Sequence, residues 1–383
     1  MGQKEIEAVR KVIEGGQLFR YADGETAKHT AKFEKALAEK LGVKHALAVS
    51  SGTGALATAL AAMGIGPGDE VIVPGYTFIA TALAPLSVGA VPVIAEVDET
   101  LTLDCSDVQQ KISRYTKAII PVHMLGLPCD LSTLMRIARK HELIVVEDAA
   151  QSAGGSYQGK RMGSIGHVGA LSFNHYKIIS SGEGGAVVTN SSQVHRRAMV
   201  YHDGGCVFFD RQSAKNTEAF FAGMNYRISE IQSAILNVQL GRLDGILEKL
   251  RARKAAMAEI MGQSDAFDLS PCHEPEGDCA TVLPLMFGSG DAAQAFAREH
   301  GRTCEMFRPI DTDRHVYTNW DPVLNHSVHH PGRNPWNWTH RMMEQGADCC
   351  PKTLEILAKT VCVKTPFDVT LADARKIART LRG

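Results

Sequence analysis

The chain lacks any long apolar run, since no window approaches the roughly eighteen consecutive apolar residues of a transmembrane helix. Residues 1–10 carry charges of both signs and lack the apolar core of a secretory signal peptide. These two absences predict a soluble, cytoplasmic protein.

An excess of charge of one sign is absent too, because 41 lysines and arginines face 42 aspartates and glutamates. Without a basic stripe we expect neither nucleic acid nor an anionic membrane as a partner. The nine cysteines include no C-x-x-C pair, which argues against a disulfide framework and against a structural zinc site. We therefore expect small-molecule substrates and no metal.

What the chain does contain is an alternation of strand and helix patterns. A length of 383 residues predicts two packed domains. Seven short apolar runs alternate with helical patterns, as buried parallel strands joined by crossover helices do. We therefore predict an α/β domain with a mostly parallel seven-stranded sheet between helices. The runs are 46–49, 70–73, 92–95, 118–122, 143–146, 169–173 and 186–189.

The patterns also predict how the chain is divided. We expect an N-terminal arm (1–24), a large domain (25–245) and a smaller C-terminal α+β domain (246–383). One long amphipathic helix, 228–254, is expected to link the two domains. The other expected elements are helices at 31–41, 55–63, 78–88, 131–141, 291–300 and 371–381, a strand at 281–287 and a loop at 271–278.

One segment, Asp311–Trp338, has no clear periodicity and contains all three tryptophans of the chain. Long irregular loops are often functional, so we expect this segment to face a substrate or a second subunit. A well-packed irregular surface segment is the alternative.

Lys177 stands in the run Ser172–Gly185, between apolar residues and a glycine-rich turn. A primary amine in such a setting can form a Schiff base with a cofactor, provided that its surroundings suppress its protonation. A solvated surface lysine is the alternative interpretation of this run taken alone.

Three further motifs carry possible chemistry. Val49–Gly54 follows an apolar strand and opens a helix, so its amides can approach an anion, or it is an ordinary capped turn. Asp148 comes just after the strand at 143–146, where ligands collect in α/β sheets, although a loop or capping Asp would look the same. Gly223–Glu230 precedes the long helix, and its Asn and Arg could simply be polar residues at a helix start.

In this order and spacing the four motifs resemble those of fold-type-I pyridoxal 5'-phosphate (PLP) enzymes, and among them the DegT/DnrJ/StrS family of sugar aminotransferases. The likeness runs from Gly16–Tyr21 to the C-terminal helix. Within the family the chain looks most like transaminases that make 8-amino-3,8-dideoxy-octulosonate, through Phe19–Tyr21, Gly223–Glu230 and Pro275–Asp278. The region after residue 300 departs from these members, which leaves the substrate open.

The resemblance implies a role for each matching residue. Lys177 matches the Schiff-base lysine, and Asp148 matches the residue that pairs with the pyridine nitrogen. Gln151 matches the polar group beside the ring hydroxyl, and Phe78 matches the aromatic that stacks on the ring. Asn225 matches a residue that reaches the phosphate from the neighbouring subunit, which implies a homodimer with shared active sites. The phosphate site is matched by Ser51, Gly52, Thr53 and Ser172.

Residues for substrate recognition are predicted from chemistry alone. Their side chains offer hydrogen bonds or stacking suited to a polyol, and ordinary packing is the alternative for each of them. The candidates are Arg20, Tyr21, Glu183, His202, Arg227, Tyr317, Asn319 and Trp320.

The implied reaction is transfer of an amino group from an amino acid, glutamate or glutamine by family likeness, to a keto-sugar or related polyhydroxy ketone. A Schiff-base mechanism in two halves predicts ping-pong kinetics. Some family members replace the lysine by histidine and perform dehydration, whereas this chain keeps Lys177. The alternatives are another PLP reaction on the same site (dehydration, decarboxylation or carbon-carbon cleavage) and a PLP-binding regulatory protein without turnover.

Overall fold

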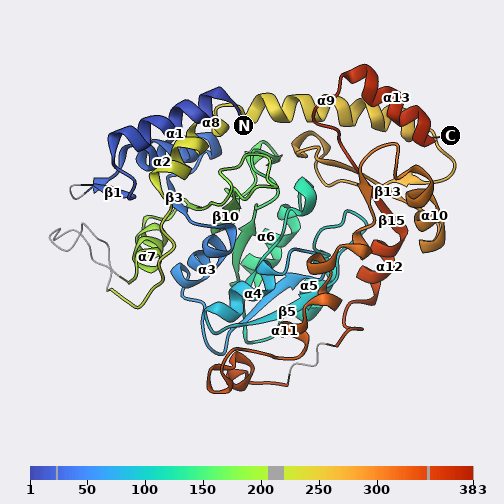
Figure 1. Cartoon of the computed structure of the whole chain (residues 1–383). Coiled ribbons are helices and arrows are strands. Elements are labelled where there is room, and N and C mark those ends of the chain that lie inside the picture. Colours follow the sequence, from blue (N-terminus) through green and yellow to red (C-terminus); the bar gives the residue numbers. More distant parts are fainter. Residues whose placement is uncertain (23–24, 206–219, 343–345, 383) are drawn as a thin grey trace.

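A computed structural model describes residues 1–22, 25–205, 220–342 and 346–382 (Figure 1). Its main sheet has seven strands in the order β3-β11-β10-β7-β6-β4-β5. All seven predicted strands lie in this sheet, which confirms the predicted fold class. They are β3 (His45–Val49), β4 (Glu70–Pro74), β5 (Val91–Ala95), β6 (Thr116–Ile119), β7 (Ile144–Asp148), β10 (Val168–Ser172) and β11 (Gly185–Thr189).

The sheet is parallel except at β11, which is antiparallel to both of its neighbours, β10 and β3. No helix lies in the connection from β10 to β11, and a parallel pairing would need a crossover of a dozen or more residues, usually a helix. That connection, Phe173–Gly184, is the loop that carries Lys177. The exception therefore places the lysine at the carboxyl end of β10.

Helices cover both faces of the sheet. Along β3, Leu47 and Val49 pack into one apolar cluster with α3 (Gly52–Ala62) and α4 (Ala80–Ser87). Ala46 and Ala48 alternate with them and pack into a second cluster on the opposite face. The helices behind that face are α2 (Lys28–Leu41), α5 (Cys105–Lys111), α6 (Leu131–Lys140) and α8 (Glu230–Leu240).

The prediction of one continuous helix at 228–254 is wrong. The structure has two helices there, α8 and α9 (Leu243–Met261), and Gly241 is the C-cap of α8. Glycine favours such a break because its backbone loses the most conformational freedom in a helix. α9 runs along the top of Figure 1 and carries the chain away from the main sheet.

A smaller antiparallel sheet follows, in the order β12-β13-β15-β14. The predicted strand and both predicted helices of this part are confirmed. Phe267, Phe287 and Phe296 pack against one another within its core, with Phe267 and Phe296 edge to face. The elements are β12 (Asp268–Leu269), β13 (Val282–Met286), α10 (Gly290–His300), β14 (Met306–Phe307), α12 (Pro351–Lys359), β15 (Thr360–Lys364) and α13 (Leu371–Arg382).

The segment after β14 does not stay with the small sheet. Tyr317, Trp320 and Trp336 join the apolar cluster of α3 and α4 on the main sheet. The C-terminal part of the chain therefore packs against both sheets. The division into a large domain (25–245) and a smaller C-terminal domain (246–383) remains a proposal. No helix in the described ranges is both long enough and apolar enough to cross a bilayer.

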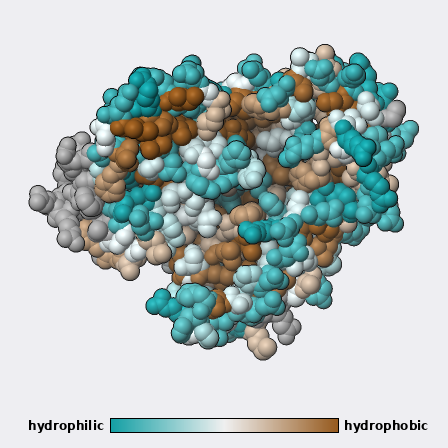
Figure 2. All heavy atoms as spheres, in the orientation of Figure 1, coloured by the Kyte–Doolittle hydropathy of each residue, from teal (hydrophilic) through white to brown (hydrophobic). Residues whose placement is uncertain are grey.

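The predicted N-terminal arm contains a helix, α1 (Gln3–Gly15), which was not among the predicted elements. It packs beside α8, where its buried Glu5 accepts a hydrogen bond from Gln239 Nε2 at 2.7 Å. Ile6, Val9 and Ile13 stand at helical spacing in the sequence, but Ile6 and Ile13 stay exposed in the structure. Figure 2 shows apolar surface over this part of the molecule.

The start of α2 depends on a carboxylate from another helix. Its N-cap, Ala27, makes no side-chain hydrogen bond, and the amides of His29 and Thr30 donate to buried Glu230 of α8 at 2.7 and 2.8 Å. We expect Glu230→Gln to lower the free energy of unfolding by about 2–3 kcal/mol, since a charged acceptor is lost. Denaturant titration measures this.

The matched control is Glu39→Gln, a substitution at an exposed position of α2. It should change the free energy of unfolding by less than about 0.5 kcal/mol. Equal stability of the Glu230→Gln variant and the unaltered protein would contradict the capping role.

Candidate active site

The predicted motifs meet at one edge of the main sheet. β7 ends at Asp148 and β10 at Ser172, and both strands run in the same direction. β3 also runs that way, because β11 is antiparallel to both β10 and β3. The carboxyl ends of all three strands therefore lie together, which is where α/β sheets bind ligands.

Glycines at this edge let neighbouring segments of the protein approach each other closely. A Cβ atom on Gly52 would lie 2.7 Å from the Ser172 Cβ, and one on Gly185 would lie 2.3 Å from the Ser51 carbonyl oxygen. Ser51 Oγ accepts the Gly54 amide at 3.0 Å, while the amides of Gly52 and Thr53 belong to the first turn of α3 and have no intrahelical partner. This arrangement suits an anion such as a phosphate.

Asp148 is a carboxylate held inside the protein. Thr81 Oγ1 donates to its Oδ2 at 2.8 Å, and the Ala150 amide donates to its Oδ1 at 3.1 Å. Burial raises the pKa of the Asp148 carboxyl, although these two donors, Lys177 and His123 oppose the shift. A cationic partner beside Asp148 would favour its ionised form.

Lys177 lies close enough to Asp148 for the two side chains to interact electrostatically. Burial lowers the pKa of the Lys177 amine, and the Asp148 charge partly restores it. Its backbone amide donates to the Asn174 carbonyl at 3.0 Å within the loop after β10. The amine is therefore neutral over a wider pH range than that of a solvated lysine, as a nucleophile or a base requires.

Gln151 and Phe78 border the same edge. Gln151 Oε1 accepts the Leu125 amide at 3.0 Å, so its side chain is held in place by the loop after β6. Phe78 lies just before α4 and is 39% exposed, whereas the preceding Thr77 is buried. An exposed aromatic at this position is available to stack on a planar ligand.

Two residues of the site were not predicted. Thr81, which donates to Asp148, stands one helical turn after Phe78, and that spacing was the only signal in the sequence. His315 comes from the tryptophan-containing segment, and its ring lies 5.4 Å from the Phe78 ring, centroid to centroid. Nothing in the local sequence pairs residue 315 with residue 78.

Three predicted substrate residues belong instead to a buried network. Arg20 is 1% exposed and is bonded to Glu34 at 2.7 Å and to the Ala48 carbonyl at 3.0 Å. The Tyr21 hydroxyl lies 3.2 Å from His202 Nε2, and His202 Nδ1 lies 2.7 Å from the Met199 carbonyl oxygen. Both terminal nitrogens of Arg20, the Tyr21 hydroxyl and both ring nitrogens of His202 are engaged inside the fold, so packing, which was the alternative interpretation, accounts for these three residues.

Tyr317 and Trp320 are core residues as well. Both are fully buried, and Trp320 Nε1 donates to the Arg314 carbonyl at 2.9 Å. The Tyr317 hydroxyl donates to the Ala347 carbonyl at 2.6 Å. Packing, which was the alternative interpretation, is correct for these two. Neighbouring Asn319 is exposed, and its amide nitrogen donates to the Asp313 carbonyl at 2.8 Å.

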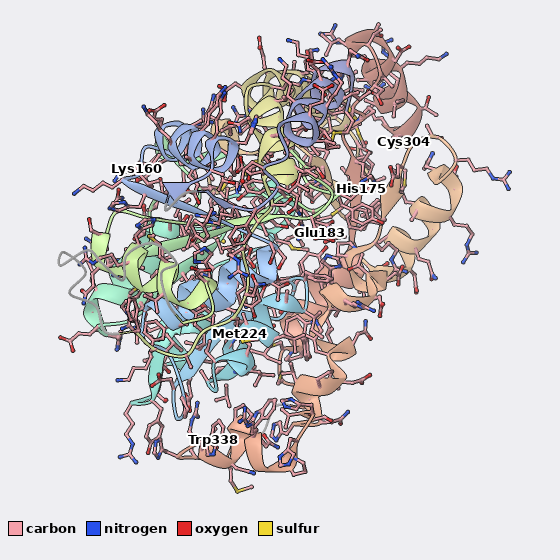
Figure 3. The ribbon with its side chains drawn as sticks, turned by 60° about the vertical axis from the view of Figure 1, so that its left-hand side comes forward. Lys160, His175, Glu183, Met224, Cys304 and Trp338 are labelled. Carbon is pink, nitrogen blue, oxygen red and sulfur yellow. The ribbon has the colours of Figure 1, made fainter. Side chains whose placement is uncertain are left out.

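The remaining predicted residues lie near the surface. Glu183 and Asn174 are joined across the Lys177 loop by a hydrogen bond of 2.8 Å. Figure 3 shows Glu183 near His175, whose backbone amide donates to the Gly182 carbonyl at 2.9 Å. Asn225 is exposed, and Arg227 pairs with buried Asp203 at 2.6 Å. The substrate roles of Glu183, Arg227 and Asn319 remain predictions.

The chain is similar in sequence to known proteins. The model of the DegT/DnrJ/EryC1/StrS aminotransferase family matches residues 1–305. GDP-perosamine synthase of Caulobacter vibrioides is 44% identical over 226 residues, which is 58% of each chain. L-glutamine:2-deoxy-scyllo-inosose aminotransferase of Streptomyces fradiae is 38% identical over 260 residues, 66% of this chain and 60% of that one. The chain thus matches about three fifths of each relative's length.

The fold has a solved counterpart of the same extent. The crystal structure of 3-amino-5-hydroxybenzoic acid synthase superposes with a TM-score of 0.82 at 26% identity, covering 100% of this chain and 96% of that one. A family match over residues 1–305 of 383 and this superposition agree. The chain belongs to the DegT/DnrJ/EryC1/StrS aminotransferase family and has the fold-type-I architecture of PLP-dependent aminotransferases.

Proposed function

We propose that this protein is a PLP-dependent aminotransferase that moves an amino group from glutamate or glutamine to a keto-sugar or a related polyhydroxy ketone. The observation that carries the proposal is the pairing of a buried carboxylate, Asp148, with a partly buried amine, Lys177, at the edge of the sheet where the first turn of α3 presents the amides of Gly52 and Thr53. An aldehyde, a phosphate and a protonatable ring in one ligand would satisfy all three features.

The residues present fit PLP. Asp148 is ionised inside the protein most easily beside a cation, and a protonated pyridine nitrogen supplies one. The amides of Gly52 and Thr53 with the Ser51 and Ser172 hydroxyls would hold the phosphate, Phe78 would cover the ring and Gln151 would meet its hydroxyl. When bound, PLP supplies an electron sink that stabilises negative charge at the donor's α-carbon.

Lys177 would both hold the cofactor and move protons. Its lowered pKa leaves a neutral amine available to attach to an aldehyde. Once a donor amine displaces it, the Lys177 amine would take the proton from the donor's α-carbon and return it on the far side of the shared nitrogen, at the carbon that had carried the aldehyde. Repeating these steps in reverse on a ketone would give the new amine, so we expect ping-pong kinetics.

The relatives support the two substrate classes. One is named for its use of L-glutamine and a cyclic polyhydroxy ketone, and the other for making an amino sugar linked to GDP. We therefore propose glutamine ahead of glutamate as the donor. The acceptor class stays at a keto-sugar or a similar ketone, because neither relative is named as an octulosonate transaminase.

We also propose the homodimer with shared active sites. Asn225 is exposed, and its Oδ1 lies 3.3 Å from the Arg227 amide. Within the described residues, no hydrogen bond joins Asn225 to Lys177. The Asn225 side chain is therefore available to reach the phosphate bound in a second subunit. Tyr176, beside Lys177, is 90% exposed, and Met224, beside Asn225, is also exposed, as expected for side chains that a partner covers.

Transfer of labelled nitrogen tests the function. The protein with added PLP would be incubated with glutamine labelled with ¹⁵N at the α-amine, together with 2-deoxy-scyllo-inosose or a GDP-linked 4-keto sugar. We expect ¹⁵N in the amine of one product by mass spectrometry. A donor that turns over only by releasing carbon dioxide or ammonia would point to another PLP reaction, and no turnover with any donor would favour a regulatory protein.

A further inference from the structure

We propose that His315 is a specificity residue, whose imidazole hydrogen-bonds a hydroxyl of the acceptor beside the reacting carbonyl. This inference rests on the proposed function, and it concerns a residue that no motif or relative assigns.

The backbone around His315 is fixed to the loop that carries Phe78. The Thr77 amide donates to the His315 carbonyl at 2.9 Å, and the Ile79 amide donates to the Arg314 carbonyl at 2.9 Å. These bonds lie on either side of Phe78, so the two chain segments run together at this point. The Phe78 ring and the His315 ring consequently face the same part of the site, at 5.4 Å and with an interplanar angle of 55°.

Buried side chains support the segment from beneath. Tyr317 donates its backbone amide to the Gly75 carbonyl at 3.0 Å, and its buried hydroxyl donates to Ala347. Trp320 is fully buried and holds the Arg314 carbonyl. The backbone of His315 is therefore held on a packed support before any substrate arrives, although most of the surrounding segment is irregular.

The ring of His315 keeps its polar atoms available. No hydrogen bond joins either ring nitrogen to another residue in the described ranges. Burial and then the Lys177 charge lower the pKa of His315 to about 4, while Asp313 opposes the shift. The ring is accordingly neutral at physiological pH, with one nitrogen donating and the other accepting.

A neutral imidazole distinguishes a polyhydroxy acceptor from an amino-acid donor. A hydroxyl both donates and accepts, so it can pair with either ring nitrogen, and the apolar ring of Phe78 can contact the carbon skeleton next to it. A carboxylate gains no attraction of opposite charge from an uncharged ring. His315 is therefore suited to a polyol acceptor and contributes less to the binding of an amino-acid donor.

The two acceptors can be compared in a single half-reaction. The PLP-bound protein is first charged with the amino group of L-glutamate, and free donor is removed. The charged protein is then mixed either with 2-oxoglutarate, which has no hydroxyl, or with 2-deoxy-scyllo-inosose. Return of the visible cofactor band gives the rate of each reaction, and the variants are His315→Phe, His315→Asn and, as a control on an exposed residue, His329→Phe.

We expect His315→Phe to slow the reaction with the polyhydroxy ketone by about ten- to a hundredfold, as loss of a hydrogen bond to a desolvated hydroxyl should. The 2-oxoglutarate reaction should change by less than about threefold, which also shows that the variant folds and binds PLP. His315→Asn should recover part of the loss, because its amide can still donate and accept. His329→Phe should match the unaltered protein with both acceptors.

If His315→Phe slows the reactions with both acceptors equally, or slows neither, the role of His315 would be overturned. The role would also be overturned if the unaltered, charged protein regains its visible cofactor band with 2-oxoglutarate but neither reacts with the polyhydroxy ketone nor is inhibited by it. If glutamate and glutamine both fail to charge the unaltered protein, the proposed function itself is wrong, and that failure is seen before any acceptor is added.

Discussion

Replacing Lys177 by alanine is expected to abolish the visible absorption band that PLP gives in the unaltered protein and to lower turnover by at least a thousandfold. The lysine would serve twice, as the covalent attachment and as the base, and a positioned base alone contributes about 10²- to 10⁴-fold. Absorption after PLP addition and borohydride reduction, with mapping of the labelled peptide, measures the attachment. A steady-state assay with glutamine measures the turnover.

Lys249→Ala is the matched control for that change. Lys249 is an exposed lysine on α9 that lines the same 1170 Å³ cavity as Lys177. Its removal should leave the band and the rate within about threefold, because it lacks the buried carboxylate partner. A reducible cofactor attachment that survives Lys177→Ala, or one that maps to another lysine, would remove Lys177 from the centre of the site.

Replacing Asp148 by asparagine is expected to lower turnover by roughly a thousandfold. A carboxylate about 4 Å from a cation interacts by about 4 kcal/mol at an effective dielectric constant near 20, and each 1.36 kcal/mol is about tenfold in rate. The asparagine keeps the size of the side chain, and its carbonyl can still accept from Thr81 or from the Ala150 amide. Loss of activity should therefore reflect the lost charge.

The same variant makes a prediction about pH that does not depend on PLP. Asp148 raises the pKa of Lys177 against the larger effect of burial, so its neutralisation should lower that pKa further. More of the amine is then neutral at any pH below its pKa. Labelling of Lys177 by trinitrobenzenesulfonate in the apoprotein should become faster, with its pH curve moved to lower pH.

Asp265→Asn, at an exposed position, is the control for both readouts. It should leave the turnover and the labelling curve unchanged. An unchanged labelling curve in Asp148→Asn would mean that the two side chains do not interact, and a variant with full activity would exclude Asp148 as the partner of the ring nitrogen.

The main sheet was predictable because each strand is buried on both faces and therefore reads as an unbroken apolar run. The same property hid the direction of β11, since buried runs look alike in parallel and antiparallel strands. The break between α8 and α9 was missed because the apolar spacing continues across Gly241, and only the glycine itself marks the break.

Some residues of the site could also be predicted from the sequence, and others could not. Residues next to strand ends, such as Asp148 and Ser172, could be placed from sequence because parallel strands end at one edge. Tyr317 and Trp320 could not, since an aromatic in an irregular segment is equally consistent with binding and with packing, and only the burial decides between them. His315 reaches Phe78 through a pairing of segments more than two hundred residues apart, which no local pattern predicts.

The most direct test of amino transfer is a single turnover with a donor and without an acceptor. The purified protein saturated with PLP would be mixed with glutamine or glutamate, and the released keto acid would be measured against the number of active sites. We predict one keto acid per site, loss of the visible cofactor band, and no further release until a ketone is added. Continued release of ammonia or carbon dioxide without an acceptor, or a band that does not respond to any donor, would contradict amino transfer at Lys177.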